Sequence, residues 1–144
     1  MRLQLIAAAA SLCLAVPVAA QPALDNFDAL KASAEISSLL ARRDLDGAAV
    51  AAARLMEATS PDKLKDAFQI VRALGQGQYT DLVYARDFGK TEKDIIYKID
   101  FDKALLFVRF LYHIDNGAWH LIRIHLARED DQPFPKEWVH IYPK

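Results

Sequence analysis

The spacing of the apolar residues changes once along this chain, near Gly75 and Gly77, and no other feature constrains its fold as strongly. Before this point apolar side chains recur every three or four residues, which is the period of an amphipathic helix. Beyond Tyr79 they alternate with polar residues, which is the period of a strand with one buried face. The sequence therefore predicts a helical half followed by a strand half, and together these make an α+β domain.

Two helices are predicted at the start of the helical half. The first has Asp25 as its N-cap and extends to Leu40, although its apolar residues do not keep to one face. Residues 44–47 are expected to form a short turn into a second helix, in which the apolar residues of 45–56 have helical spacing. The alanine run 48–53 suggests a close approach to a neighbouring element.

A third helix has the clearest start. Ser60 is its expected N-cap, Pro61 occupies the first helical position, and Asp62 meets the positive end of the helix dipole. One apolar stripe follows, consisting of Leu64, Phe68, Val71 and Leu74. Gly75 is expected to end the helix.

The first two predicted strands are joined by a turn at residues 88–90. Leu82, Tyr84 and Arg86 are expected to share one side of the first strand. The second strand has an apolar side and a polar side. Its apolar side consists of Ile95, Tyr97, Ile99 and Phe101, and its polar side of Asp94, Lys98 and Asp100.

The last two strands are predicted at 105–114 and 119–126, and they flank an Asn116-Gly117 pair that favours the positive φ angles of a tight hairpin turn. Both faces of this hairpin carry large apolar groups, so we expect it to be central in the sheet and covered on both sides. A C-terminal tail, 129–144, begins with a charge run. Its apolar residues are expected to pack back on the body: Phe134, Trp138, Val139, Ile141 and Tyr142.

Residues 1–20 have the pattern of a cleavable signal peptide. Arg2 supplies a short positive region, and residues 3–16 form an apolar stretch that ends at Pro17. The small residues 18–20 suit a signal peptidase, so cleavage is expected before Gln21. The remaining residues, 21–144, are expected to form a single domain in the periplasm or outside the cell.

Two alternatives to this cleavage stay open. One is an uncleaved N-terminal membrane helix, but the apolar run is shorter than the ~20 residues that a comfortable bilayer span needs. The other is a lipoprotein acylated at Cys13. The large Leu12 before it and the hydrophobic residues after it argue against lipidation.

Composition excludes several classes of function. Cleavage removes the only cysteine, so the mature chain has no disulfide and no cysteine-based metal site. The formal net charge is -1 and no long block of one sign occurs, so a nucleic-acid partner is not expected. No glycine-rich phosphate loop and no Gly-x-Ser-x-Gly elbow is present, and no cofactor is predicted. No membrane span is expected after cleavage.

The order of elements, with helices first and then antiparallel strands ending in the hairpin 115–119, resembles the nuclear transport factor 2-like superfamily, a cystatin-like α+β cone. The likeness is greatest to its secreted bacterial members of uncharacterised function. It includes Asp-Gly-Ala at 46–48, the Ser60-Pro61 helix start, and a final Gly-x-Trp hairpin. The resemblance implies N-terminal helices packed in the concave face of a curved antiparallel sheet of four or more strands, with a cone-shaped cavity between them.

Enzymes of this superfamily place an aspartate or histidine in the cavity beside a hydrogen-bond donor, often tyrosine. Groups of these types here are Tyr84, Tyr97, Tyr112, Asp100, His113 and Arg109. No local spacing assigns any of them a role, so the catalytic residues, if any exist, are unknown. Five residues are candidates for ligand binding: Tyr84, Tyr97, Arg109, His113 and Arg123.

Each candidate also has a structural interpretation. Arg109 and Arg123 lie within apolar strands, where they hold an anion or, more often, pair with an acid or extend along the sheet surface. Tyr84 and Tyr97 stack on a ligand or pack in the core. His113 and His120 are expected to lie opposite each other if the turn has two residues, but a one-residue bulge would break that pairing. No recognised zinc spacing occurs, so no metal is predicted.

Two functions stay open at this level. The first is a non-catalytic binding or protein-interaction domain, with a small-molecule or protein partner and a homodimer through the sheet as one form. The second is a small isomerase, lyase or hydrolase that uses general acid and base groups in the cone. The missing catalytic signature favours the first.

Overall fold

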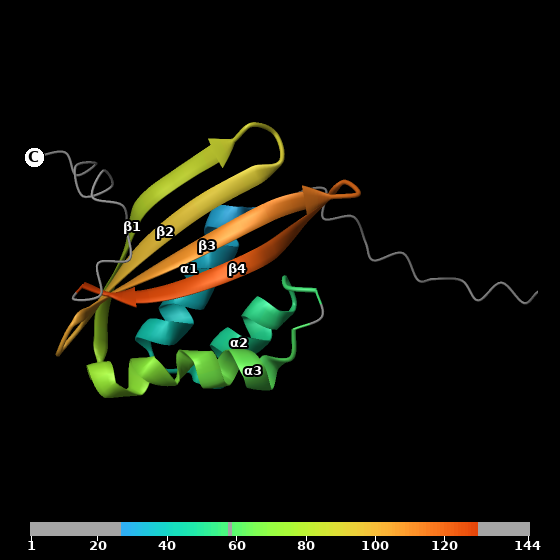
Figure 1. The fold of residues 1–144 in the computed structure, drawn as a ribbon. Helices are drawn as coiled ribbons and strands as arrows, with labels where there is room; N and C mark the ends of the chain where they lie inside the picture. The colour runs from blue at the N-terminus through green and yellow to red at the C-terminus, as the bar shows by residue number, and fades with distance from the viewer. Residues whose placement is uncertain (1–26, 58, 130–144) are drawn as a thin grey trace, which may run out of the picture.

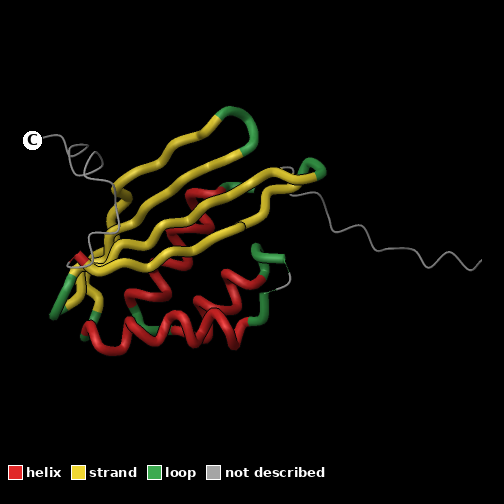
Figure 2. Tube along the Cα trace, in the orientation of Figure 1, coloured by secondary structure: helices red, strands yellow, loops and turns green. Residues whose placement is uncertain are grey.

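The computed structural model describes residues 27–57 and 59–129, and it has the predicted α+β architecture (Figure 1). The elements are α1 (Ala29–Ala41), α2 (Leu45–Ala53), α3 (Pro61–Ala67), the 3₁₀ helix η1 (Phe68–Leu74), β1 (Gly77–Phe88), β2 (Glu92–Phe101), β3 (Leu105–Asp115) and β4 (Ala118–Arg128). The strands form one antiparallel sheet in the order β1-β2-β3-β4. The helices lie on one face of this curved, open sheet (Figures 1 and 2). The predicted signal peptide and the tail from residue 130 onward lie outside the described residues.

The N-cap of α1 is Asp28, so the prediction of Asp25 is wrong. The Asp28 carboxylate accepts a hydrogen bond from the backbone N–H of Lys31 at 3.1 Å. Asp25 itself is not among the described residues. The buried side of α1 includes Ser33 and Ser37 together with apolar residues. These two serines explain why the apolar residues alone do not trace one clean face.

The segment 44–47 is the first turn of α2 and not a separate turn before it. Asp44 caps the helix, because its carboxylate accepts a hydrogen bond from the backbone N–H of Gly47 at 2.9 Å. The helix is shorter than predicted and ends at Ala53. Its buried alanines let it pack closely between α1 and α3, as the alanine run suggested.

The predicted start of the third helix is confirmed. The Ser60 hydroxyl accepts a hydrogen bond from the backbone N–H of Lys63, and Pro61 is the first helical residue. At Phe68 the α-helix gives way to η1, whose period of about three residues keeps its buried side chains on one side. These are Phe68, Val71 and Leu74. Gly75 ends the helix with a φ of 92°, which favours glycine.

Asp102, in the turn between β2 and β3, ties the end of η1 to the sheet. Its carboxylate accepts hydrogen bonds from the backbone N–H of Gln76 at 2.9 Å and from the side-chain amide of Gln78 at 2.8 Å. These two bonds, the first being the larger effect, lower the pKa of Asp102 below its ordinary value. The Asp102 backbone N–H donates in turn to the Gln76 carbonyl at 3.1 Å.

Two bulges change which side chains share a face of the sheet. In β1 the register shifts between Leu82 and Tyr84, so that Leu82 pairs with Tyr97 on the helix side. Tyr84 and Arg86 pair with Ile96 and Asp94, on the opposite face of the sheet. The expectation that Leu82 shares their face is therefore wrong. In β4 the register shifts next to Tyr112, which pairs with Leu121.

The hairpin between β3 and β4 has the predicted two-residue turn. Asn116 and Gly117 have φ angles of 49° and 80°, as a tight turn of this kind requires. His113 pairs with His120 as expected, because the bulge lies further along the strands. However, β4 is an edge strand of the described sheet, so the prediction of a central position is wrong for it. The backbone N–H of Leu121 donates to the carbonyl of Leu55, beyond the end of α2, at 2.8 Å.

The core lies between the helices and the sheet face that they cover, which we call the inner face. α1 packs across β1, β2 and β3, and its Ile36 and Leu40 are fully buried. The inner face contributes alternate residues from each strand, and the apolar side predicted for the second strand is confirmed. The buried residues of this face include Ile95, Tyr97, Ile99, Phe101, Leu106, Val108, Phe110, Tyr112 and Leu121.

Candidate functional site

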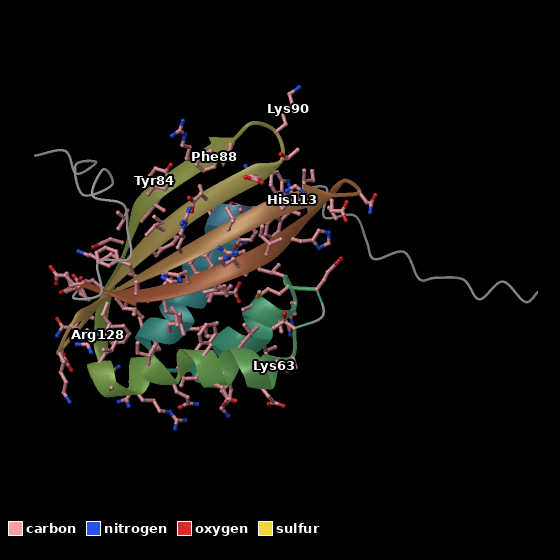
Figure 3. All side chains as sticks on the ribbon, in the orientation of Figure 1. Lys63, Tyr84, Phe88, Lys90, His113 and Arg128 are labelled. Carbon is pink, nitrogen blue, oxygen red and sulfur yellow. The ribbon has the colours of Figure 1, made fainter. Side chains whose placement is uncertain are left out.

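The five predicted ligand-binding residues lie on opposite faces of the sheet. Tyr97 belongs to the inner face. The other four belong to the face turned away from the helices, which we call the outer face. Figure 3 labels two of them, Tyr84 and His113. Three of the rows that the strand register forms across the outer face contain these four residues: Phe88, Glu92, His113 and His120; Arg86, Asp94, Leu111 and Arg123; and Tyr84, Ile96, Arg109 and His125. One ligand cannot contact all five predicted residues, because the sheet separates Tyr97 from the rest.

Arg109 pairs with an acid, as the structural interpretation of this residue expects. Its Nη2 and Nε donate to the two carboxylate oxygens of Asp94 at 2.6 and 2.9 Å. The Asp94 side chain is fully buried, whereas that of Arg109 is 35% exposed. The hydrogen bond with Asp94 raises the pKa of Arg109. Much of the donor capacity of Arg109 is therefore directed at Asp94.

The cations at the turn ends of the outer face are more accessible. Arg123 is exposed, and its register partner across β3 is Leu111, which is half-buried. The guanidinium of Arg86 lies over the Phe88 ring, 5.1 Å from its centre, and both residues are exposed. Arginine stacked on an aromatic ring next to apolar groups is the chemistry found at protein-binding surfaces.

His113 and His120 each lie beside an acidic side chain. His113 Nδ1 lies 3.9 Å from the Glu92 carboxylate on the neighbouring strand. His120 Nδ1 lies 3.3 Å from the carboxylate of Glu57, which follows α2. Within residues 27–57 and 59–129, no three histidine, cysteine or acidic side chains are close enough together to hold a metal ion. His113 and His120 therefore each lie beside a different carboxylate and do not converge on one site.

Polar groups of the inner face are engaged with their neighbours. The hydroxyl of Tyr112 is hydrogen-bonded to that of Ser33 at 2.8 Å, and both residues are fully buried. Burial raises the pKa of Tyr112 to about 12. The Tyr97 hydroxyl lies 3.4 Å from the Leu30 carbonyl, and burial, followed by the charge of Asp28, raises its pKa. Tyr97 and Phe110 pack edge to face with ring centres 6.5 Å apart, which is the core interpretation of this tyrosine.

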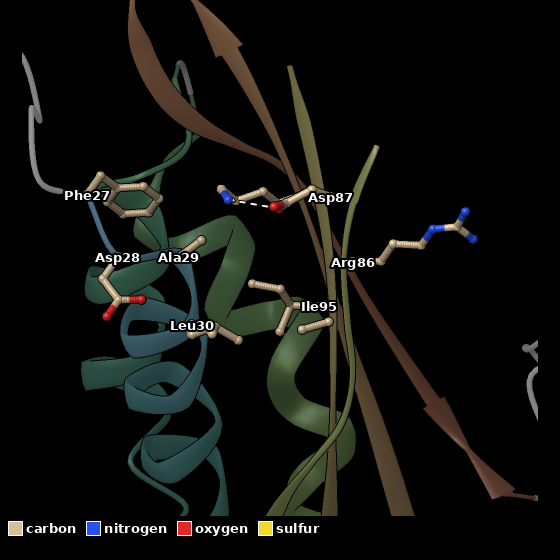
Figure 4. A pocket seen from close by; sticks show the side chains of 9 residues that line it. Phe27, Asp28, Ala29, Leu30, Arg86, Asp87 and Ile95 are labelled. Carbon is tan, nitrogen blue, oxygen red and sulfur yellow. Dashed lines mark hydrogen bonds and ion pairs between the residues drawn. The ribbon is translucent and has the colours of Figure 1, made fainter. Parts of the chain in front are cut away.

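A cavity of about 470 Å³ opens where the start of α1 faces the β1–β2 hairpin (Figure 4). Its lining residues are Phe27, Asp28, Ala29, Leu30, Ala85, Arg86, Asp87, Lys93 and Ile95. The Lys93 amine donates to the Asp87 carboxylate at 2.8 Å, and it also lies 5.0 Å from the centre of the Trp119 ring. The Arg86 side chain points away from the cavity (Figure 4).

The resemblance implies a cavity between the helices and the sheet, but none of the site residues nominated from the sequence lines this one. Asp87 and Lys93 are opposite each other in the β1–β2 hairpin, and the turn at 88–90 could have revealed that pairing. Asp28 joins the lining of this cavity because α1 packs on the sheet, and no local pattern in the sequence predicts that packing. The other nominated acid, Asp100, is on the outer side of β2, 3.3 Å from the Lys98 amine.

Comparisons with known proteins add no relative to this description. No family model matches the sequence, and a search of curated proteins finds no match either. In the part of the chain that the structure describes, no helix has the length and apolar character to cross a bilayer. The structure therefore defines a small α+β domain whose helices cover one face of an antiparallel sheet.

Proposed function

We propose that this chain is an exported, non-catalytic binding domain of the periplasm or cell exterior, and that it acts through the outer face of its sheet. The observation that carries the proposal is the position of four predicted residues. Tyr84, Arg109, His113 and Arg123 share the face that the described helices leave open. Around them lie apolar and aromatic side chains, including Leu111 and Phe88.

The composition of this face suits a protein partner with apolar and acidic groups. Tyrosine and arginine are enriched among the residues that dominate binding energy at interfaces. Arg123 and Arg86 are exposed cations near the turn end of the face, where an acidic side chain of a partner can approach them. A second copy of this chain is one such partner, because the outer face carries an accessible acid as well as cations: the Glu92 side chain, next to His113, is 46% exposed.

The catalytic alternative has weaker support. A general acid or base must reach the substrate inside the cone. On the inner face the buried Tyr112 hydroxyl is bonded to Ser33, and the Lys93 amine at the cavity is bonded to Asp87. The described histidines, His113, His120 and His125, take register positions on the outer side of the sheet.

The proposal includes membership of the nuclear transport factor 2-like superfamily. Its support is the order of the elements, with helices packed on one face of a curved antiparallel sheet, and the Asn116-Gly117 hairpin at the end. The experiment for function is a mass measurement of the exported protein in solution, combined with a thermal-shift screen of small molecules and of periplasmic proteins. A strict monomer that no molecule in the screen stabilises would contradict the proposal.

A matched pair of variants locates the binding surface. Arg123→Glu reverses an exposed charge on the outer face, and Arg72→Glu reverses an exposed charge on η1. We expect the first to abolish dimer formation or the thermal shift given by a partner, and the second to leave both unchanged. Equal behaviour of the two variants would place binding elsewhere. N-terminal sequencing of the exported protein tests the signal peptide, for which the expected first residue is Gln21.

A further inference from the structure

Burial on the outer face is uneven, and the described helices do not explain it. Ile96 is 2% exposed and Ala127 is 2% exposed, yet neither belongs to the core between the helices and the sheet. Asp94 is fully buried on the same face. At the turn end, in contrast, the His113 side chain is 43% exposed and Arg123 is also exposed.

An uncovered sheet does not give this pattern. Ala127 is on the edge strand β4, where one flank has no neighbouring strand in the described sheet. An edge residue of an open face ordinarily keeps contact with water, because sheets need a second layer to bury a face. The area around Ile96, Phe107 and Ala127, which we call the covered area, therefore requires a layer that α1, α2, α3 and η1 do not supply, since they lie on the other side (Figure 1).

We propose that the C-terminal segment 130–144 is this layer and packs across the covered area. The segment follows β4 directly, and Ala127 is three residues before its first residue. Fifteen residues extend up to about 50 Å, whereas crossing from β4 to β1 spans about 15 Å, so its reach is sufficient.

The composition of the segment agrees with a packed role. It holds five large apolar residues: Phe134, Trp138, Val139, Ile141 and Tyr142. A tail that stays in water usually has few large apolar residues, because burying such residues favours packing against the folded domain. From Trp138 onward, alternation puts Val139 and Ile141 on one side of an extended chain.

The segment leaves the turn end of the outer face, with Arg123 and His113, for another molecule. A segment over Ile96 also covers its register partners Tyr84 and Arg109, so the surface left for a partner is the turn end alone. The test of the segment itself needs no partner.

The test is hydroxyl-radical labelling of side chains in the full-length protein and in a variant that ends after Glu129, with mass-spectrometric readout. We expect Phe107 labelling to rise several-fold when the segment is removed, while Phe110 on the inner face stays unchanged as an internal reference. The double variant Trp138→Ser/Ile141→Ser should have the same effect. Val50→Ser, which removes an exposed apolar group from α2, is the matched control and should change neither site.

Three results would overturn the inference. The first is equal Phe107 labelling with and without the segment. The second is labelling that falls as dimers form, which would identify a second copy as the layer. If both variants unfold, the synthetic peptide 130–144 is added to the shortened chain. Recovery of the folded sheet supports the inference, and failure to recover it is the third contrary result.

Discussion

Asp94 and Arg109 form a two-bond ion pair across β2 and β3, in which the carboxylate is fully buried and the guanidinium is partly exposed. The two residues therefore differ in their contact with water. Replacing Arg109 with methionine leaves a buried carboxylate without this partner, and removing one member of such a pair costs about 3 kcal/mol or more. Replacing Asp94 with asparagine leaves a guanidinium that water can reach. We expect Arg109→Met to lower the free energy of unfolding more than Asp94→Asn does.

The double variant Asp94→Leu/Arg109→Met separates charge from packing. Apolar replacement of a whole buried ion pair is often close to neutral, so the double variant should be more stable than Arg109→Met alone. Urea denaturation of these proteins and of Asp94→Leu alone measures the differences. A double variant that loses as much as Asp94→Leu and Arg109→Met added together would show that the pair is not energetically coupled.

The buried hydroxyl pair of Tyr112 and Ser33 gives a second prediction. Ser33→Ala leaves the Tyr112 hydroxyl buried without this partner, and we expect a loss of about 1–3 kcal/mol in the free energy of unfolding. The matched control is Ser37→Ala, one turn later on the buried side of α1. The Ser37 hydroxyl is buried with no hydrogen-bond partner within the described residues, so its removal should be neutral or stabilising. Equal losses at the two serines would contradict this account.

Tyr112 also predicts how stability changes at alkaline pH. Burial raises its pKa from 10.0 to about 12, so the folded state keeps the phenol neutral where the unfolded chain ionises it. The contribution of this group is complete below pH 10 and is lost as the pH rises from 10 toward 12. We expect Tyr112→Phe to be less sensitive than the native chain over this window in thermal unfolding. Parallel loss of stability in the two proteins would argue against a buried phenol.

How far the sequence predicts this structure depends on whether the signal is local. The Ser60-Pro61 start and the Asn116-Gly117 turn are confirmed, because the capping hydroxyl and the positive φ angles are set by neighbouring residues. Asp25 fails as a cap because Asp28 precedes the same apolar residues equally well. The bulge between Leu82 and Tyr84 is hidden for a related reason, since one extra residue in an alternating strand leaves no mark in composition.

The candidate surfaces were harder to predict than the elements. Alternation places Tyr84, Arg109, His113 and Arg123 on strands, but it does not say which side the helices cover. The large apolar groups on both sides of the last hairpin suggested a central position, whereas β4 is at the edge of the described sheet. The cavity beside Asp28 and Lys93 depends on how α1 packs, which is a tertiary property.

Asp102 predicts a loss of stability in acid. Its pKa is lowered by hydrogen bonds from the Gln76 backbone and the Gln78 side chain, so the folded state favours the carboxylate. The contribution is present above the ordinary value of 3.8 and is lost as the pH falls below it. The difference in melting temperature between the native chain and Asp102→Ala should therefore shrink as the pH falls from about 6 to about 3. Asp66→Ala, on α3, controls for loss of an exposed carboxylate. A constant difference would contradict the assignment.

The close approach of β1 to α1 predicts a steric cost at Gly77. A Cβ built on Gly77 would lie 2.7 Å from the Cα of Ala41, at the end of α1, and neither backbone can move without shifting its element. Gly77→Ala should therefore cost about 1–3 kcal/mol, the range for overpacking a filled interior. Gly89, in the β1–β2 turn, has φ 63°, and a Cβ built there would have open space around it. Asparagine tolerates that conformation, so Gly89→Asn should change the free energy of unfolding by no more than about 0.5 kcal/mol. Urea denaturation of both variants measures the contrast. If Gly77→Ala is as mild as Gly89→Asn, the start of β1 adapts to the extra methyl group and the junction between α1 and the sheet is looser than these contacts imply.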